Sequence, residues 1–292
     1  MSVRQREATH RHLFFDSDGQ RVLGVLQTPD RPMRPGALVF LHGWAGYRIG
    51  PHQMFTKAAR QAAELGFASL RFDFRGRGDS QGDAAATTLS TMIEDAQRAV
   101  EVVCDETGAE RVALIGDCSG SEVAIGAATL DERIDSLVLW SAPIVAGDRS
   151  EADAAKRRSM YSTYLRKIFR RETWSKLLGG RLQPGMILKA LTRGGKGAGE
   201  EGAESDREID WYHRFVDFAG EVMLIYGGND PTTDSALEHY RELSRKAGRE
   251  LNHHIVDGAN HAFYSLGWEQ EVLEVSLEWL CERYAAGEGA DG

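Results

Sequence analysis

The chain has 292 residues, of which 42% are hydrophobic and 27% are charged. A chain of this length can bury a full core, either in one large domain or in one domain that carries an insertion. Its formal net charge of -9 argues against general nucleic-acid binding. It lacks the run of about 18 apolar residues that a membrane-spanning helix needs. Three scattered cysteines cannot supply a disulfide framework and no signal peptide is recognisable, so we expect a cytoplasmic protein that does not bind membranes.

Short apolar runs alternate with helix-like segments over most of the chain. The strand-like runs cover residues 12–15, 22–27, 37–41, 67–72, 112–115, 136–140, 221–226 and 251–256. Helices are expected at residues 52–65, 89–106, from about 119 onward, at 233–247 and at 267–284. Such alternation predicts βαβ units around a mostly parallel sheet. The uninterrupted apolar run 37–41 is typical of a strand that is buried on both faces.

The alternation stops at Pro143 and resumes at Glu221. The sequence between them is charged and has helical spacing of its aromatic residues, which indicates an insertion into the α/β domain. The predicted units are an α/β core of residues 1–142 and 220–286, a helical lid of residues 143–219 after the sixth strand, and a disordered tail of residues 287–292.

The insertion is basic, because residues 148–196 hold 13 Lys or Arg against 4 Asp or Glu. These charges either form an ordinary solvated helix face or attract an anionic acyl donor such as coenzyme A or an acidic carrier protein. Aromatic side chains in the insertion are candidates for an apolar, substrate-binding wall, and we name Tyr161, Tyr164 and Trp211 for this role.

A sharp strand-to-helix junction is expected at Gly116-Asp117-Cys118-Ser119-Gly120, which has the form Gly-x-nucleophile-x-Gly. Such a turn forces the middle residue into a strained backbone conformation, and the two glycines leave room for it. Cys118 is therefore a candidate nucleophile, although a free cysteine is also common as a small core residue. Ser119 is a weaker candidate, because shifting the frame by one residue loses both glycines.

Two polar residues follow later predicted strands. Asp230 lies in a tight loop after residues 221–226, and His261 lies in a loop after residues 251–256. In an open parallel sheet, functional groups gather at the carboxyl ends of the strands. Taken alone, Asp230 could be a turn residue and His261 a hydrogen-bonded loop histidine. Their order after Cys118 is that of nucleophile, acid and histidine.

Taken together, these motifs resemble the α/β-hydrolase superfamily. The matching pieces lie between residues 37 and 263 and are His42-Gly43, Asp73-x-Arg75-Gly-x-Gly78-x-Ser80, Gly-x-Cys118-x-Gly, Gly-x-x-Asp230-Pro and Gly-x-x-His261. The resemblance implies the α/β-hydrolase fold, with an eight-stranded, mostly parallel sheet that is flanked by helices. In that fold, Asp73 and Arg75 are expected to brace loops.

The resemblance also implies residue roles. Cys118 would be the nucleophile, His261 the general base and Asp230 the acid that orients the base. The backbone N–H groups of Trp44 and Ser119 would form the oxyanion hole. The adjoining pair His42 and Gly43 would shape that loop or contact the substrate.

Most members of the superfamily have serine at the position of Cys118, whereas dienelactone hydrolases, like this chain, have cysteine. Those enzymes lack a large lid, so their substrate is not transferred to this chain. A thiol at a helix N-terminus beside a histidine is favoured as the thiolate, which attacks esters and thioesters readily. We therefore expect a hydrolase that acts on a small-molecule ester or thioester through an acyl-cysteine intermediate.

Two other functions stay open at this stage. An acyltransferase would use the same acyl-enzyme with a different acceptor, and a binding protein could retain the hydrolase scaffold without turnover. No cofactor is expected, and no metal site either, because His10, His12, His253 and His254 lack carboxylate or cysteine partners at ligand spacing. The oligomeric state is left open.

Overall fold

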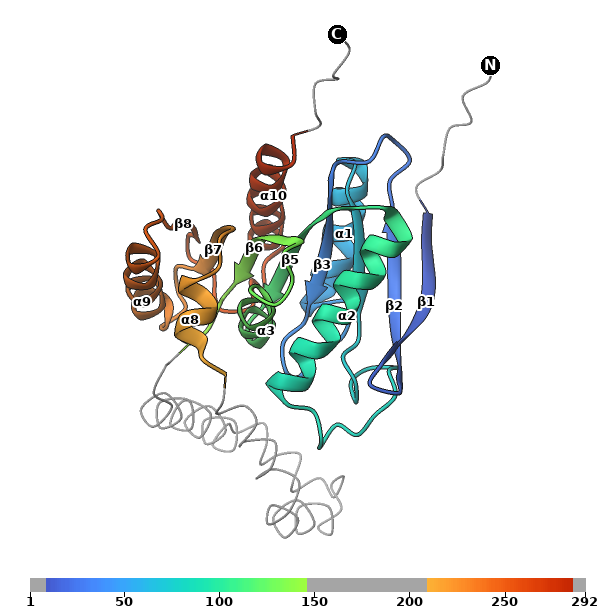
Figure 1. Ribbon diagram of the computed structural model, residues 1–292. Coiled ribbons are helices and arrows are strands. Elements are labelled where there is room, and N and C mark those ends of the chain that lie inside the picture. Colours follow the sequence, from blue (N-terminus) through green and yellow to red (C-terminus); the bar gives the residue numbers. More distant parts are fainter. Residues whose placement is uncertain (1–8, 146–208, 286–292) are drawn as a thin grey trace, which may run out of the picture.

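The computed structural model describes residues 9–145 and 209–285, which contain one eight-stranded sheet with helices on both faces (Figure 1). Its strands are β1 (Thr9–Ser17), β2 (Gln20–Thr28), β3 (Gly36–Leu41), β4 (Ala68–Phe72), β5 (Arg111–Asp117), β6 (Ile134–Trp140), β7 (Glu221–Gly227) and β8 (Asn252–Val256). They lie in the order β1-β2-β4-β3-β5-β6-β7-β8. The pairs β1–β2 and β2–β4 are antiparallel and the other five pairs are parallel, so the prediction of an eight-stranded, mostly parallel sheet is confirmed.

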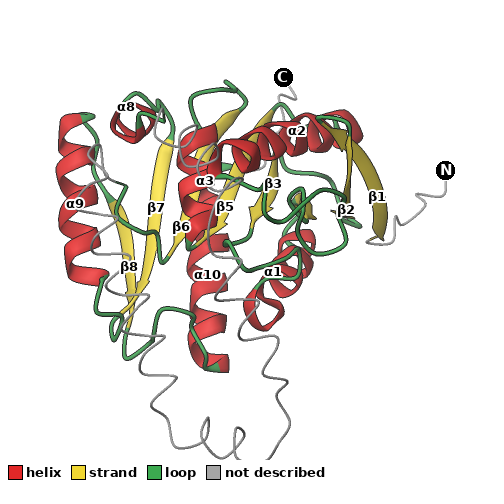
Figure 2. Cartoon of the chain, turned by 90° about the horizontal axis from the view of Figure 1, so that it is seen from below, coloured by secondary structure: helices red, strands yellow, loops and turns green. Residues whose placement is uncertain are grey.

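Helices cover both faces of this sheet. They are the short η1 (Pro51–Gln53), α1 (Met54–Glu64), α2 (Leu89–Thr107), α3 (Ser119–Ala127), α8 (Trp211–Val216), α9 (Thr233–Lys246) and α10 (Leu266–Arg283). Helices α1 and α10 pack on one face, and α2, α3 and α8 pack on the other (Figure 2). Within the described ranges, no helix is long and apolar enough to cross a membrane.

The central strand β3 is buried on both faces, as its apolar run predicts. Leu38 and Phe40 belong to the core under α1 and α10, whereas Val39 and Leu41 belong to the core under α2 and α3. All four side chains are fully buried. The carboxyl end of β3 is thereby fixed beside the carboxyl end of β5, its parallel neighbour.

The described end of the predicted lid packs as part of the core. Trp211 and Phe215 of α8 are 3% and 1% exposed, and they lie in the same apolar cluster as α3. The predicted lid, which was expected to end at residue 219, therefore includes α8, a helix that covers one face of the sheet. Residues 146–208, with Tyr161 and Tyr164, lie outside the described residues, as does the expected tail, and the lid itself stays a prediction.

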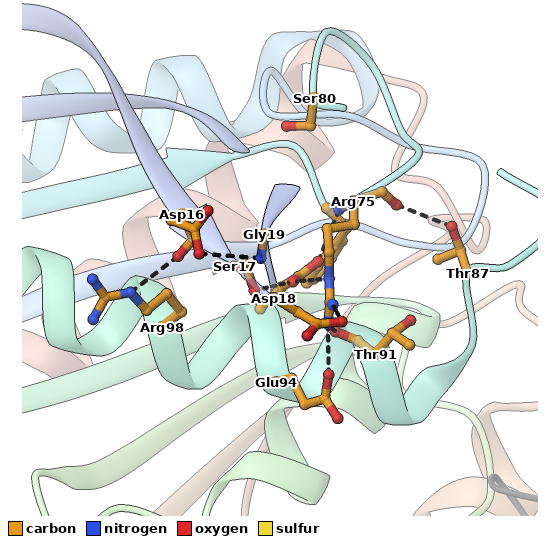
Figure 3. A network of polar contacts seen from close by, with 12 residues as sticks. Asp16, Ser17, Asp18, Gly19, Arg75, Ser80, Thr87, Thr91, Glu94 and Arg98 are labelled. Atoms are coloured by element: carbon orange, nitrogen blue, oxygen red, sulfur yellow. Dashed lines mark hydrogen bonds and ion pairs between the residues drawn. The ribbon is translucent and has the colours of Figure 1, made fainter. Parts of the chain in front are cut away.

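A partly buried polar network joins the β1–β2 turn, the loop after β4 and helix α2 (Figure 3). The guanidinium of Arg75 pairs with the carboxylates of Asp18, Glu94 and Asp95. Asp95 is 1% exposed and also accepts hydrogen bonds from Ser17 Oγ at 2.6 Å and from the Arg75 N–H at 2.8 Å. Arg75 therefore braces this loop, as expected from the sequence.

Replacing Asp95 with alanine should destabilise the protein by about 3 kcal/mol, because Arg75 would keep a buried charge without its buried partner. Glu94→Ala is the matched control: it removes a carboxylate from the same guanidinium, but that carboxylate is 59% exposed, so the expected loss is below about 1 kcal/mol. Urea unfolding of both variants measures the difference. Equal losses would show that burial of the carboxylate does not decide the strength of this network.

Candidate active site

Cys118 occupies the bend between β5 and α3. Its backbone has φ 52° and ψ -119°, in the left-handed half of the backbone map that residues with side chains rarely adopt. The Cys118 N–H donates to the Trp140 carbonyl at 2.9 Å, and the Ser121 N–H donates to the Cys118 carbonyl at 2.9 Å. The strained bend is thus held from both sides, and it presents the thiol at the carboxyl edge of the sheet.

The two glycines of the pentapeptide are required by close backbone approach. A Cβ atom on Gly116 would lie 2.6 Å from the Gly120 carbonyl oxygen, and one on Gly120 would lie 2.0 Å from the Leu41 carbonyl oxygen. Real Cβ atoms do not come this near to backbone. The Gly-x-Cys-x-Gly pattern therefore follows from the tight packing of α3 against the end of β3.

The loops after β7 and β8 bring Asp230 and His261 together. The loops are joined by backbone hydrogen bonds, from Gly228 N–H to the Val256 carbonyl at 2.9 Å and from Asn229 N–H to the Ala259 carbonyl at 2.7 Å. Across them, His261 Nδ1 lies 2.6 Å from Asp230 Oδ2. The two residues are 31 apart in sequence. They meet because each follows the carboxyl end of one of two neighbouring parallel strands, β7 and β8.

Asp230 is held as a charged acceptor. Its other oxygen, Oδ1, accepts hydrogen bonds from the Thr232 N–H at 3.0 Å and the Thr232 hydroxyl at 2.8 Å. Burial alone would raise the pKa of Asp230, but the hydrogen bonds from His261 and Thr232 outweigh it and lower the pKa below its ordinary value. Sequence reasoning missed Thr232, although a carboxylate that accepts from the residue two positions later is a recurrent turn.

His261 connects this carboxylate with the thiol. The hydrogen bond to Asp230, followed by one to Cys118, raises the pKa of His261 to about 10. Because Nδ1 faces Asp230, Nε2 is the ring nitrogen left for Cys118. The structure thus brings together the three side chains that the sequence singled out.

Asp117 precedes the thiol and interacts electrostatically with the same histidine. Burial raises the pKa of Asp117 to about 6, and the charge of His261 acts in the opposite direction. Asp230 and Asp117 therefore differ in kind: hydrogen bonds hold the first as a carboxylate, whereas the second gains its charge only near pH 6.

The loop after β3 lies over the bend. A Cβ atom on Gly43 would be 3.5 Å from Cys118 Cβ and 3.6 Å from Ser119 Oγ, so the Gly43–Trp44 peptide adjoins both residues. The Trp44 N–H donates to Ser119 Oγ at 2.6 Å. The sequence assigned the backbone of Ser119 to the oxyanion hole and offered its hydroxyl only as a weaker candidate nucleophile. It carried no signal for the hydrogen bond between that hydroxyl and Trp44.

His42 shapes this loop from inside the protein. Its side chain is fully buried, with Nδ1 2.8 Å from the Gly43 carbonyl and Nε2 accepting the Phe74 N–H at 3.3 Å. Burial lowers the pKa of His42 to about 4, so the ring is neutral at pH 7. The suggestion that the His42 side chain contacts substrate is therefore wrong, because both ring nitrogens are used by the backbone.

The remaining candidates do not come together here. Trp211 is packed against α3, where a Cβ atom on Gly126 would be 3.4 Å from its ring, and so it is not an exposed substrate-facing wall. In the part of the chain that the structure describes, no cluster of His, Cys, Asp and Glu side chains could hold a metal ion.

Two histidines of this region should differ in charge at pH 7, with His261 protonated and His42 neutral. His261 should remain an imidazolium up to about pH 10, and His42 should remain neutral down to about pH 4. In Asp230→Asn, the pKa of His261 should fall because its largest stabilising partner is neutralised, while His42 should not change. Histidine ¹⁵N NMR titration measures both. A wild-type His261 that titrates near pH 6.5 would contradict the coupling to Asp230.

Comparison with known proteins agrees with this architecture. Residues 36–173 match the family model described as the alpha/beta hydrolase fold. Over 140 residues, the chain is 25% identical to an uncharacterised 31.7 kDa protein from Escherichia coli encoded between traX and finO; the alignment covers 45% of this chain and 47% of that protein. The chain thus spans about half the length of this relative and 28% of a second, human relative.

Solved structures match over nearly the whole chain. An esterase from Pyrococcus furiosus is 17% identical with a TM-score of 0.66, covering 95% of this chain and 92% of its own. A dienelactone hydrolase from Anabaena variabilis is 14% identical with a TM-score of 0.60, covering 95% of this chain and 98% of its own. At these identities the likeness concerns the fold. The chain has the α/β-hydrolase fold.

Proposed function

We propose that this protein hydrolyses carboxylic esters or thioesters through a covalent acyl-cysteine intermediate, with Cys118, His261 and Asp230 as the catalytic triad. The observation that carries the proposal is the 2.6 Å hydrogen bond between His261 Nδ1 and Asp230, which orients the imidazole. The interaction of His261 with Cys118, which together with Asp230 raises the pKa of the imidazole, supports the same assignment. A nucleophile, a base within its reach and an acid that orients the base are the parts that acyl transfer requires.

In the proposed first step, the Cys118 sulfur attacks the carbonyl carbon of the substrate. A C–S bond forms, the carbonyl π pair moves onto oxygen, and the thiol proton resides on His261. When the carbonyl re-forms, the bond to the leaving alkoxide or thiolate breaks and the imidazolium supplies its proton. Asp230 stays a carboxylate throughout, since its hydrogen bonds with His261 and Thr232 favour the charged form.

Water completes the cycle. His261 removes a proton from water, the resulting hydroxide attacks the acyl carbon, and the C–S bond breaks to release a carboxylic acid. The proposed oxyanion hole consists of the N–H groups of Trp44 and Ser119. The proximity of Gly43 to Cys118 supports the first donor, and the place of Ser119 at the start of α3, where helical N–H groups lack intrahelical acceptors, supports the second.

The substrate class follows from the nucleophile and from the rim of the site. A thiol exchanges readily with thioesters and attacks activated esters, whereas amides are much poorer substrates for it. The loops after β3 and β8, which carry the proposed site, also expose Trp44 (43%) and Tyr264 (66%), and these aromatic residues favour a substrate with an apolar group. The similarity to structures of an esterase and a dienelactone hydrolase supports ester chemistry.

Mixing the protein with a panel of acyl esters and thioesters should add the acyl mass to Cys118. Intact-protein mass spectrometry with peptide mapping detects this adduct, which should be absent in Cys118→Ala. Cys118→Ser should keep the geometry but turn over thioesters more slowly, because a hydroxyl must be deprotonated as it attacks. A wild-type protein that binds these compounds without ever becoming acylated would overturn the proposal in favour of a binding protein.

Product analysis separates the hydrolase from an acyltransferase. With the acyl-enzyme formed, the free acid should be the product even when an alcohol, amine or thiol acceptor is added. Preferential formation of a new ester, amide or thioester would show that the same intermediate serves acyl transfer.

A further inference from the structure

The hydroxyl of Ser119 lies beside the proposed oxyanion hole. It accepts the Trp44 N–H at 2.6 Å, and that N–H is one of the two donors expected to bind the oxyanion. Ser119 is 8% exposed, so this hydrogen bond is formed with little competition from water. The Trp44 N–H could therefore bind the oxyanion on its own only by giving up its hydrogen bond to Ser119 Oγ.

The same hydroxyl has one proton to give. A serine hydroxyl is one donor and two lone pairs, and the Trp44 N–H uses a lone pair. Within residues 9–145 and 209–285, Ser119 Oγ forms a hydrogen bond only with the Trp44 N–H. In that part of the chain, no acceptor binds the proton of the Ser119 hydroxyl. A buried donor without an acceptor is unfavourable, so an acceptor that arrives with the substrate would be favoured there.

The Ser119 hydroxyl lies at the loop that covers Cys118. A Cβ atom placed on Gly43 would lie 3.5 Å from Cys118 Cβ and 3.6 Å from Ser119 Oγ, so the thiol-bearing carbon and the hydroxyl adjoin the same point of the loop. The Ser119 N–H starts α3 and has no acceptor in a preceding helical turn. The N–H and the O–H of one residue thus stand next to the nucleophile.

We infer that the Ser119 hydroxyl is a hydrogen-bond donor to the oxyanion and relays to it the polarisation of the Trp44 N–H; this inference rests on the proposed function. As the C–S bond forms and the carbonyl π pair moves onto oxygen, the oxyanion accepts the Ser119 N–H and O–H, and the Trp44 N–H, named above as a direct donor, acts on it through the hydroxyl instead. The hydroxyl meanwhile accepts the Trp44 N–H, which strengthens its own donor. Its proton is not transferred, and the electron pair returns when the leaving group departs with the proton from His261.

Ser119→Ala tests the donor, and Ser121→Ala is the matched control. Ser121 lies two residues further along α3, is fully buried, and its hydroxyl donates to the Gly116 carbonyl at 3.0 Å. Removing it takes away a buried hydroxyl hydrogen bond of the same bend without altering the group beside Trp44. Ser119→Thr keeps the hydroxyl and serves as the conservative variant.

The readouts are kcat and KM for an activated ester and the affinity for a trifluoromethyl ketone, which forms a tetrahedral adduct with the thiol. Ser119→Ala should lower kcat about 100-fold with KM little changed, and should weaken the ketone by a similar factor. Ser119→Thr should recover most of the activity, and Ser121→Ala should resemble wild type. Circular dichroism confirms that each variant is folded.

Equal or faster turnover by Ser119→Ala would overturn the inference, since the hydroxyl would then only compete for the Trp44 N–H. An equal loss in Ser121→Ala would also overturn it, because the effect would then come from distortion of the bend. Mass spectrometry separates this failure from that of the proposed function. If the wild type forms acyl-Cys118 and Ser119→Ala forms it as fast, the inference alone fails; if the wild type never does, both fail.

Discussion

The hydrogen bond between His261 and Asp230 is the interaction on which the proposed chemistry depends. It joins two loops that are separately fixed to the ends of β7 and β8, and those loops also exchange backbone hydrogen bonds. Asp230 is buried and bound on its other oxygen by Thr232, so the imidazole is oriented by a carboxylate that cannot itself turn away. Because Asp230 binds Nδ1 of His261, the other ring nitrogen, Nε2, is the one available to Cys118.

A second constraint acts on the backbone. The bend at Cys118 is strained, and it persists because β5 and α3 fix its two ends and the backbone of Trp140 and Ser121 binds it by hydrogen bonds. Glycine is needed where α3 meets the end of β3, since any Cβ on Gly120 would overlap the Leu41 carbonyl. The same close approach brings the loop after β3 over the thiol. The strain, the glycines and the proposed oxyanion hole are therefore parts of one packing arrangement.

Local pattern was enough to predict most of the framework. Apolar runs located all eight strands to within a few residues, and the order of Cys118, Asp230 and His261 placed them at one sheet edge. The features that sequence could not supply depend on contacts between distant segments. The burial of His42, the raised pKa of Asp117 and the Trp44–Ser119 hydrogen bond each require the packed loops to be seen. Helix α8 was assigned to the lid because an apolar helix face has the same pattern on a lid as on a core.

Selective alkylation tests the central claim, that Cys118 is a nucleophile activated by His261. The chain has two other cysteines as internal references, and burial raises the pKa of both Cys104 and Cys281. With substoichiometric iodoacetamide at pH 7 and peptide mapping, Cys118 should be modified first, and His261→Ala should remove that preference. Modification of Cys281 at the same rate as Cys118 in the wild type, or an unchanged Cys118 rate in His261→Ala, would contradict the account.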